Sequence, residues 1–317
     1  MIRIQVLERA GEFESVRPFW ERLAARSEAT VFQQFHWNRL AAEIFGERER
    51  PYVVVATRDN HSVILPLVVR RNGTAALLGE TLFDYRDLLS TGDAELELAA
   101  LREASKLELP LEITALTPGA AQRWNLFTLK PFCNAPRIVR ANCSSEHLIE
   151  SHGRLGRHSR RLAARGAQFK HRDGSDREFI RDLYAKKSEQ EGSLFTDPLR
   201  REFMERVCHE EGSRCRIFTY ETSTDIVAAL LTLHSDHARL VYTTYFDPEW
   251  QAFSPGQVLL FESSVEVLND DLDCDFLTGE YPYKMRLANQ SVPLMRLEAS
   301  AEEWREALRR RQARVAA

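Results

Sequence analysis

The stretch Phe246-Asp-Pro-Glu-Trp-Gln-Ala-Phe-Ser-Pro-Gly-Gln-Val-Leu-Leu260 joins a strand-like run to an amphipathic helix. The residues just before it are rich in β-branched and aromatic side chains and lack Gly and Pro, which favours a β-strand. Ser254-Pro255-Gly256 is typical of a helix start, because Ser often caps the first turn and Pro fits the first helical position. No acidic side chain occurs between Gln251 and Phe261, so the positive helix end predicts a phosphate-binding loop.

The composition excludes several classes of protein. A net charge of −4 over 317 residues does not suggest a protein that binds nucleic acid through bulk charge. The five cysteines form no C-x-x-C pair, and His158, His234 and His237 lack metal-ligand spacing, so no metal site is expected. The start of the chain lacks the apolar core of a signal peptide, and no apolar run is long enough to span a bilayer. We expect a cytoplasmic protein whose only membrane contact would be peripheral.

The order of predicted elements repeats along the chain. A strand at about 51–58 has a counterpart at about 214–220, and the other elements follow at a similar offset of roughly 160 residues. The repeat predicts two α/β domains, residues 1–135 and residues 136–317. Side-chain identity between the two halves is negligible, so this prediction rests on element order alone.

The two predicted domains differ in charge at the corresponding helix start. The helix near residue 93 opens with Asp93, Glu95 and Glu97, whose carboxylates would repel a phosphate. We therefore expect cofactor binding in the second domain only, and expect the first domain to shape the substrate side of a cleft.

Two groups of polar residues are candidates for binding the acceptor substrate. Asp84, Tyr85 and Asp87 cluster near a predicted strand, where paired carboxylates would suit a polar acceptor such as an amino sugar. Arg157 and Arg161 lie one helical turn apart in a basic segment, which would suit an anionic acceptor. An exposed acidic turn and a solvated helix face are the structural alternatives to these functional interpretations.

The phosphate-type loop also carries a family resemblance. Gln251-x-x-Ser254-x-Gly256 resembles the Gln/Arg-x-x-Gly-x-Gly/Ala loop of the GNAT acyltransferase superfamily, with Ser in place of the first Gly. Over most of its length the chain looks like the CelD-type acetyltransferases of cellulose and exopolysaccharide synthesis, a tandem-GNAT branch related to the FemAB enzymes. The motifs that carry this resemblance are Phe32–Trp37, Ile64–Leu67, Asp84–Asp87, Arg160–Gly166, Phe246–Pro248, Ser254–Gly256 and Asp275–Lys284.

The resemblance implies a fold and a cosubstrate. The fold would be two GNAT-like α/β domains, each with a mixed sheet flanked by helices, and the catalytic cleft would lie between them. The cosubstrate would be acetyl-CoA or another acyl-CoA, with its pyrophosphate on Gln251, Ser254, Gly256 and Gln257. A main-chain N–H near Tyr245 or Phe246 would polarise the thioester carbonyl.

The segment Asp275–Lys284 is dense in groups that can move protons. Amine acylation needs a base for the ammonium proton, and we assign that role to Glu280. Tyr283 is the candidate acid for the departing thiolate, and Lys284 would orient an anionic substrate or stabilise charge. Asp275 is a catalytic candidate too, although a carboxylate at a strand end often binds neighbouring N–H groups instead.

These features together favour a cytoplasmic acyl-CoA-dependent N-acyltransferase that acts on a small polar acceptor or a glycan precursor. O-acylation stays open, because the sequence does not define the nucleophile. One alternative is a FemAB-like transferase that uses aminoacyl-tRNA, in which the basic segment would bind phosphates. Another is a catalytically silent scaffold in a polysaccharide-synthesis assembly.

Overall fold

The computed structural model describes residues 1–26, 29–79 and 82–316, with the side chains of the last helix described up to residue 312. The chain divides into two compact units. The first comprises residues 1–133 and 293–317, and the second comprises residues 134–292. Among the described residues, no helix is both long enough and apolar enough to cross a membrane.

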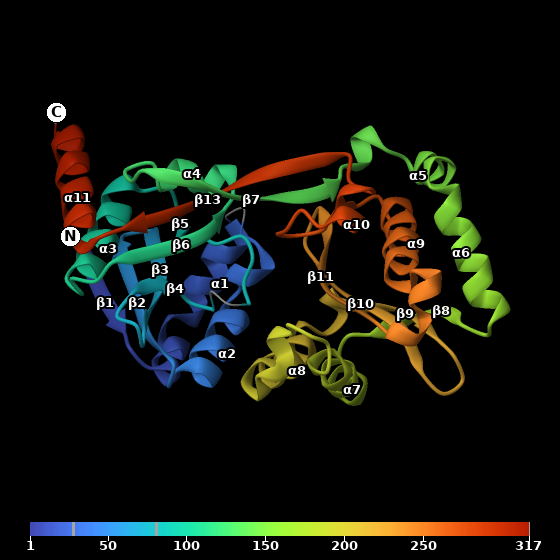
Figure 1. The fold of residues 1–317 in the computed structure, drawn as a ribbon. Helices are drawn as coiled ribbons and strands as arrows, with labels where there is room; N and C mark the ends of the chain where they lie inside the picture. The colour runs from blue at the N-terminus through green and yellow to red at the C-terminus, as the bar shows by residue number, and fades with distance from the viewer. Residues whose placement is uncertain (27–28, 80–81, 317) are drawn as a thin grey trace. The chain divides into compact units, whose positions relative to one another are not determined.

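The first unit is a mixed sheet with helices on both faces (Figure 1). Its strands, in their order across the sheet, are β1 (Arg3–Leu7), β2 (Glu49–Arg58), β3 (His61–Arg70), β4 (Ala75–Leu77), β6 (Leu111–Leu116) and β13 (Gln290–Ala299). The short strand β5 (Leu89–Ser90) pairs with β3. The helices are η1 (Ala10–Val16), α1 (Arg17–Arg26), η2 (Val31–Gln33), α2 (Phe35–Phe45), α3 (Ala94–Ser105), α4 (Pro118–Arg123) and α11 (Ala301–Ala316).

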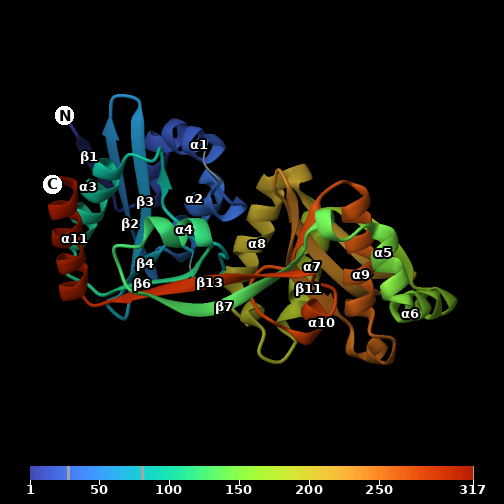
Figure 2. The same cartoon turned by 90° about the horizontal axis from the view of Figure 1, so that it is seen from above.

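The alternation of side chains along β2 explains why both faces of this sheet are covered. Tyr52, Val54 and Ala56 belong to a core with residues of α3 and α11, and those two helices lie side by side in both views (Figure 2). The intervening Val53 and Val55 are 0% and 3% exposed, and they face the opposite side, where α1 and α2 lie. Each face of the strand therefore buries its own apolar row.

The second unit is also a mixed sheet between helices. Its strands, in order, are β7 (Leu129–Ile138), β12 (Asp273–Asp275), β11 (Ala238–Phe246), β10 (Ile226–His234), β9 (Cys215–Glu221) and β8 (Gln168–Asp173). The helices are η3 (Arg140–Asn142), α5 (Ser145–Ser151), α6 (Gly153–Ala164), α7 (Arg177–Ser188), η4 (Leu194–Thr196), α8 (Pro198–Glu211), η5 (Gly212–Arg214), η6 (Pro248–Phe253), α9 (Pro255–Asn269) and α10 (Pro282–Met285). Helices α5, α6 and α9 cover one face, and α7 and α8 cover the other (Figures 1 and 2).

The two units repeat one pattern. Each contains a strand, two helices, three strands, a helix and a strand in that order, from β1 to β6 and from β8 to β12. The strands also follow one another in the same order across the sheet, and the last pair is parallel in both units. This shared order is what a tandem duplication would produce.

The C-terminal segment differs from its expected place in the second domain. Residues 293–317 belong to the first unit, because Trp304, Ala307 and Leu308 of α11 are part of that unit's core. Strand β13 starts at Gln290 in the second unit and continues into the first. The expected boundary near residue 135 lies close to the observed division between residues 133 and 134.

We predict that Trp304→Ala lowers the free energy of unfolding by about 3–5 kcal/mol, because it empties the space of a large, fully buried side chain. Trp304→Phe should cost much less, since the indole Nε1–H has no hydrogen-bond partner among the described residues and none is lost. Chemical denaturation of both variants measures the difference. Equal losses would show that α11 does not depend on the volume of this side chain.

Candidate functional site

Strand β11 has an open edge near its C-terminal end. It pairs with β12 through only three residue pairs, the last of which is Leu240 with Asp275. The N–H of Asp247 donates to the Val227 carbonyl of β10 at 2.9 Å. Because backbone groups alternate along a strand, the N–H and carbonyl of Phe246 point the other way, toward the edge that β12 has left. The Phe246 carbonyl is reached there by Gln190 Nε2 at 3.0 Å.

At the start of α9, Ser254 adopts a backbone conformation that is usually found at glycine. Ser254 lies in the left-handed region, with φ 52° and ψ 49°, where residues other than Gly are uncommon. This is the position at which the GNAT loop pattern carries Gly. The Ser254 side chain does not cap the helix, so the expected N-cap position is confirmed but the expected capping bond is absent. Its hydroxyl is left for other partners.

The helix start offers fewer free donors than the sequence suggested. The Ser254 carbonyl accepts hydrogen bonds from the N–H groups of Gln257 at 3.0 Å and Val258 at 3.1 Å. Pro255 has no N–H, which leaves that of Gly256 as the donor of the first turn. A phosphate at this loop would therefore depend on side chains as well as on the backbone.

Gly256 is required by packing as well as by access. A Cβ added there would lie 3.3 Å from Cδ1 of Phe246 and 3.7 Å from Cγ2 of Thr244. A side chain at this position would be in tight contact with the Phe246 ring, which would have to shift by a few tenths of an ångström. Gly256 thus holds the helix start against the end of the strand that carries the open edge.

A hollow of about 450 Å³ lies between the open edge and the start of α9. Tyr283 lines it, and burial raises the pKa of the Tyr283 hydroxyl, while the Thr244 side chain opposes that shift. Lys187 lines it from the end of α7, and its Nζ donates to Gln190 Oε1 at 2.7 Å. Burial lowers the pKa of Lys187. The hollow is lined by Lys187, Gln190, Thr244, Phe246, Gln251, Ser254, Pro255, Gly256, Gln257 and Tyr283.

A second hollow, of about 330 Å³, shares Ser254, Gln257 and Tyr283 with the first and is more basic. Arg154, His158 and Arg286 are among its lining residues, and neither arginine forms an ion pair with a carboxylate of the described residues. Arg286 Nη1 donates to Gln257 Oε1 at 3.2 Å. His158 Nδ1 lies 3.0 Å from the Phe253 carbonyl, so Nδ1 carries the proton and Nε2 is left for other contacts. The positive charge gathers beside the loop that the sequence assigned to phosphates.

Of the predicted catalytic residues, only Tyr283 lines these hollows. Lys284 is buried, and its Nζ donates to the carbonyls of Phe276 at 2.6 Å and Thr278 at 2.8 Å. These contacts hold the loop after β12, and the predicted role of Lys284 in orienting an anion stays a prediction.

The two predicted carboxylates of this segment also make structural contacts. Asp275 Oδ1 accepts a hydrogen bond from the Leu277 N–H at 2.8 Å, which is the capping alternative noted above. Glu280 is exposed and accepts a hydrogen bond from Asn134 Nδ2 at 2.8 Å. Glu280 is not among the residues that line the two hollows, so its assignment as the base stays a prediction from the sequence.

The predicted acidic acceptor site of the first domain is largely buried. Asp87 is 5% exposed and accepts hydrogen bonds from Trp124 Nε1 and the Leu88 N–H, both at 2.8 Å. It also forms an ion pair with Arg123. Burial raises the pKa of Asp87, and the Arg123 guanidinium opposes that shift. Asp87 therefore anchors the core of the first unit instead of binding substrate.

The neighbours of Asp87 and the predicted arginines are not among the residues that line the two hollows. Tyr85 is 8% exposed and Asp84 is half-buried, so neither forms an exposed acidic turn. Arg157 and Arg161 are exposed on α6 and line neither hollow, whereas Arg154 and His158 of the same helix do. The basic segment thus contributes Arg154 and His158 to the second hollow, and the predicted role of Arg157 and Arg161 stays a prediction.

Several residues of the site were not found from the sequence. Lys187 and Gln190 come from the end of α7, and Arg286 follows α10. A lysine near the C-terminus of a helix is ordinary, so no local pattern marks Lys187. Among the described residues, no group of three or more His, Cys, Asp or Glu side chains is arranged to hold a metal ion.

Comparison with known proteins shows the type of domain. Residues 151–285 match the family model of the acetyltransferase (GNAT) domain, so this part of the chain is similar to GNAT-type acetyltransferases. No curated protein sequence matches the chain. The fold is a mixed α/β GNAT-like fold with its sheet flanked by helices, and tandem GNAT proteins are among its structural neighbours.

Three solved structures illustrate the likeness of fold. A conserved protein of unknown function from Bacteroides thetaiotaomicron VPI-5482 is 10% identical, with a TM-score of 0.60 over 94% of this chain and 100% of that chain. FemX is 9% identical, with a TM-score of 0.60 over 88% and 95% of the two chains. A tandem GNAT protein from the clavulanic acid biosynthesis pathway is 13% identical, with a TM-score of 0.50 over 94% and 98%. At these identities the likeness shows the fold alone.

We predict that Ser254→Gly raises the free energy of unfolding by about 0.5–1 kcal/mol. Relief of a left-handed residue that costs of order 1–3 kcal/mol should outweigh the added entropy of Gly in the unfolded chain. Ser254→Ala should leave stability nearly unchanged, because it keeps the strain and removes a hydroxyl that caps nothing. Thermal unfolding of the two variants measures both effects, and a less stable Gly variant would contradict the strain at this position.

Proposed function

We propose that the second unit is an acyl-CoA-dependent N-acyltransferase that acts on the amine of a polar acceptor. The observation that carries the proposal is that two hollows meet at Ser254, Gln257 and Tyr283, one basic and one beside the open edge of β11. The resemblance to CelD-type proteins supports an amino sugar or an envelope-polymer precursor as the acceptor.

The basic hollow suits the phosphates of CoA. Arg154 and Arg286 carry charges unpaired with acids of the described residues, and both lie beside the helix start with its Gly256 N–H. Charge-assisted hydrogen bonds from guanidinium groups to phosphate are strong and specific in direction. We propose that these side chains, together with Gln251 and Gln257, compensate for the few backbone donors of the loop.

The hollow beside β11 suits the thioester end. The Phe246 N–H points toward this open edge, where it would stabilise negative charge on the carbonyl oxygen during acyl transfer. Gln190 fixes the Phe246 carbonyl and so holds this last residue of the strand in place. The reaction breaks the bond from the acyl carbon to the CoA sulfur and forms a bond to the acceptor nitrogen. The ammonium nitrogen gives up two protons: a base takes one, and the other ends on the leaving CoA thiol.

We assign the proton transfers to Lys187 and Tyr283. Lys187 would take the ammonium proton of the acceptor, directly or through water, because burial favours its neutral amine. Tyr283 keeps its proton over a wider pH range than an exposed tyrosine, since burial raises its pKa. It would donate a hydrogen bond to the leaving sulfur, a modest requirement because a thiolate leaves readily.

The cosubstrate is tested with changes at Gln251, which is exposed and lines the hollow. Gln251→Glu should weaken acetyl-CoA binding at least tenfold in calorimetry, because it sets a carboxylate beside the phosphates. Gln251→Arg, the other residue of the family pattern, should keep or strengthen binding. Ala252→Glu adds the same charge one residue away, at an exposed position that lines neither hollow, and should have little effect.

Two outcomes would contradict the cosubstrate proposal. Undiminished binding in Gln251→Glu would place acyl-CoA elsewhere. No heat with acetyl-CoA or longer acyl-CoAs in the unchanged protein would favour the scaffold alternative.

The assignment of Lys187 is tested by its pH profile. We predict that Lys187→Met lowers kcat about a hundredfold or more, which is the usual contribution of a positioned base, while acyl-CoA affinity stays within about twofold. In the unchanged protein, kcat at saturating acceptor should rise with pH through the pKa of Lys187, below the usual value of 10.5, and this rise should be absent in the variant. Lys186→Met, on the same helix but outside both hollows, is the matched control.

Lys187→Arg separates proton transfer from simple attraction. Arginine keeps the positive charge but does not release its proton near neutral pH, so it should be as impaired as methionine. Near-normal turnover in Lys187→Arg would show that the amine acts only as a charge.

A further inference from the structure

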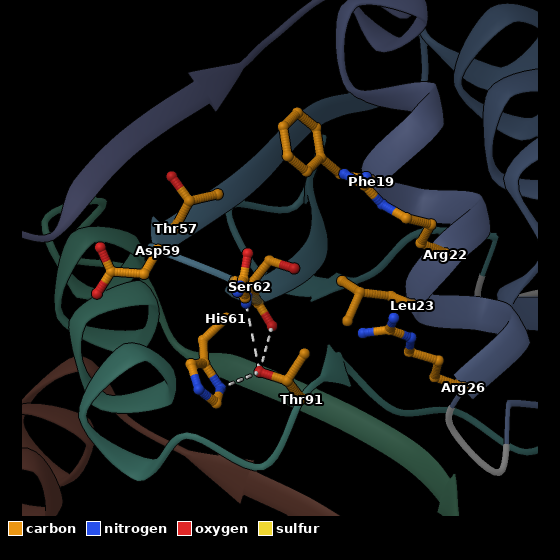
Figure 3. Close-up of a pocket in the computed structure, with 10 residues that line it drawn as sticks. Phe19, Arg22, Leu23, Arg26, Thr57, Asp59, His61, Ser62 and Thr91 are labelled. Carbon is orange, nitrogen blue, oxygen red and sulfur yellow. Dashed lines mark hydrogen bonds between the residues drawn. The ribbon is translucent and has the colours of Figure 1, made fainter.

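A third hollow, of about 350 Å³, is lined only by residues of the first unit, outside the segment 151–285 that matches the GNAT model (Figure 3). It is bounded by α1 on one side and by the turn between β2 and β3 on the other. Buried Leu23 and Ser62 lie at its floor, and exposed Arg22 and Arg26 stand on its rim. Its size falls within the range of small-molecule sites.

Two positively charged side chains, Arg22 and Arg26, lie close together on the rim of the hollow. Arg22 and Arg26 are one helical turn apart on α1, a spacing at which like charges repel. Neither forms an ion pair with an acid of the described residues, and Asp59 is the one acid among the lining residues. The Arg22 guanidinium lies 4.9 Å from the centroid of the exposed Phe19 ring, which holds it at the rim. An anion in the hollow would relieve this repulsion.

The floor supplies hydroxyl groups. Thr91 Oγ1 accepts a hydrogen bond from the Ser62 N–H at 3.3 Å and lies 3.3 Å from His61 Nδ1, so its position is fixed (Figure 3). Ser62 is only 9% exposed, and its own hydroxyl has no hydrogen-bond partner among the described residues. The Ser62 hydroxyl is therefore available to a ligand or to water at the floor of the hollow.

We propose that this hollow binds a small hydroxylated oxyanion, with the anionic group on Arg22 and Arg26 and the hydroxylated body over Ser62 and Thr91. Two guanidinium groups match the oxygens of either a phosphate ester or a carboxylate. The polar floor favours a sugar-like body over an apolar one. The site contains none of the residues assigned to acyl transfer, so a test of one proposal does not decide the other.

Calorimetry with three probes of similar size tests the site: glucose 6-phosphate, gluconate and glucose. Glucose 6-phosphate or gluconate should bind with one-to-one stoichiometry, and whichever binds tighter identifies the anionic group. Arg22→Gln with Arg26→Gln should weaken that binding at least tenfold without altering thermal stability, since both side chains are exposed. Ser62→Ala, which leaves the charge unchanged, should weaken it a few-fold.

A matched pair of substitutions in the second unit guards against binding at the basic hollow there. Arg154→Gln with Arg286→Gln removes the same charge and should leave affinity for the probe unchanged. The proposal is overturned if that pair, rather than the pair on α1, abolishes binding. Equal affinity for neutral glucose, or no binding of either anionic probe, would overturn it as well.

Discussion

The parting of β11 from β12 is the constraint on which the candidate site depends. The two strands pair only from Ala238–Asp273 to Leu240–Asp275, after which β11 continues to Phe246 with β10 as its partner. Backbone groups on the free edge must then find other partners, because an unpaired polar group away from water is costly. Gln190 supplies one such partner, and a bound substrate would supply another.

The start of α9 depends on that strand end for its position. Gly256 allows the helix to approach Phe246 closely, and the left-handed Ser254 turns the chain from η6 into the helix. The loop therefore keeps the left-handed backbone conformation that glycine usually provides, although Ser254 occupies that position. The side chains of Arg154 and Arg286 add positive charge beside the helix start, where few backbone N–H groups are free.

The local elements of the site were predictable, but the side chains that meet there were not. The strand at 237–246 and the helix from residue 254 agree with β11 and α9 to within about one residue, because β-branched runs and Ser-Pro-Gly starts act through nearest neighbours. Lys187 and Tyr283 line the same hollow only because the fold brings their elements together, so no spacing in the sequence relates them. The burial of Asp87 was not predictable, because its partner Trp124 lies 37 residues along the chain. The hydrogen bonds from Lys284 to backbone carbonyls were not predictable either, because no sequence pattern marks them.

The return of the chain to the first unit has a consequence for biosynthesis. Residues 134–292 form one uninterrupted segment, whereas the first unit needs β13 and α11 from the far side of that segment. During translation the second unit is therefore complete while the first still lacks Trp304 and its neighbours. The first unit therefore cannot complete its core before the second has been synthesised, unlike an N-terminal domain built from one continuous segment. Until residues 293–317 emerge, the nascent first unit exposes the apolar surface that α11 later covers, and a chaperone would find its binding site there.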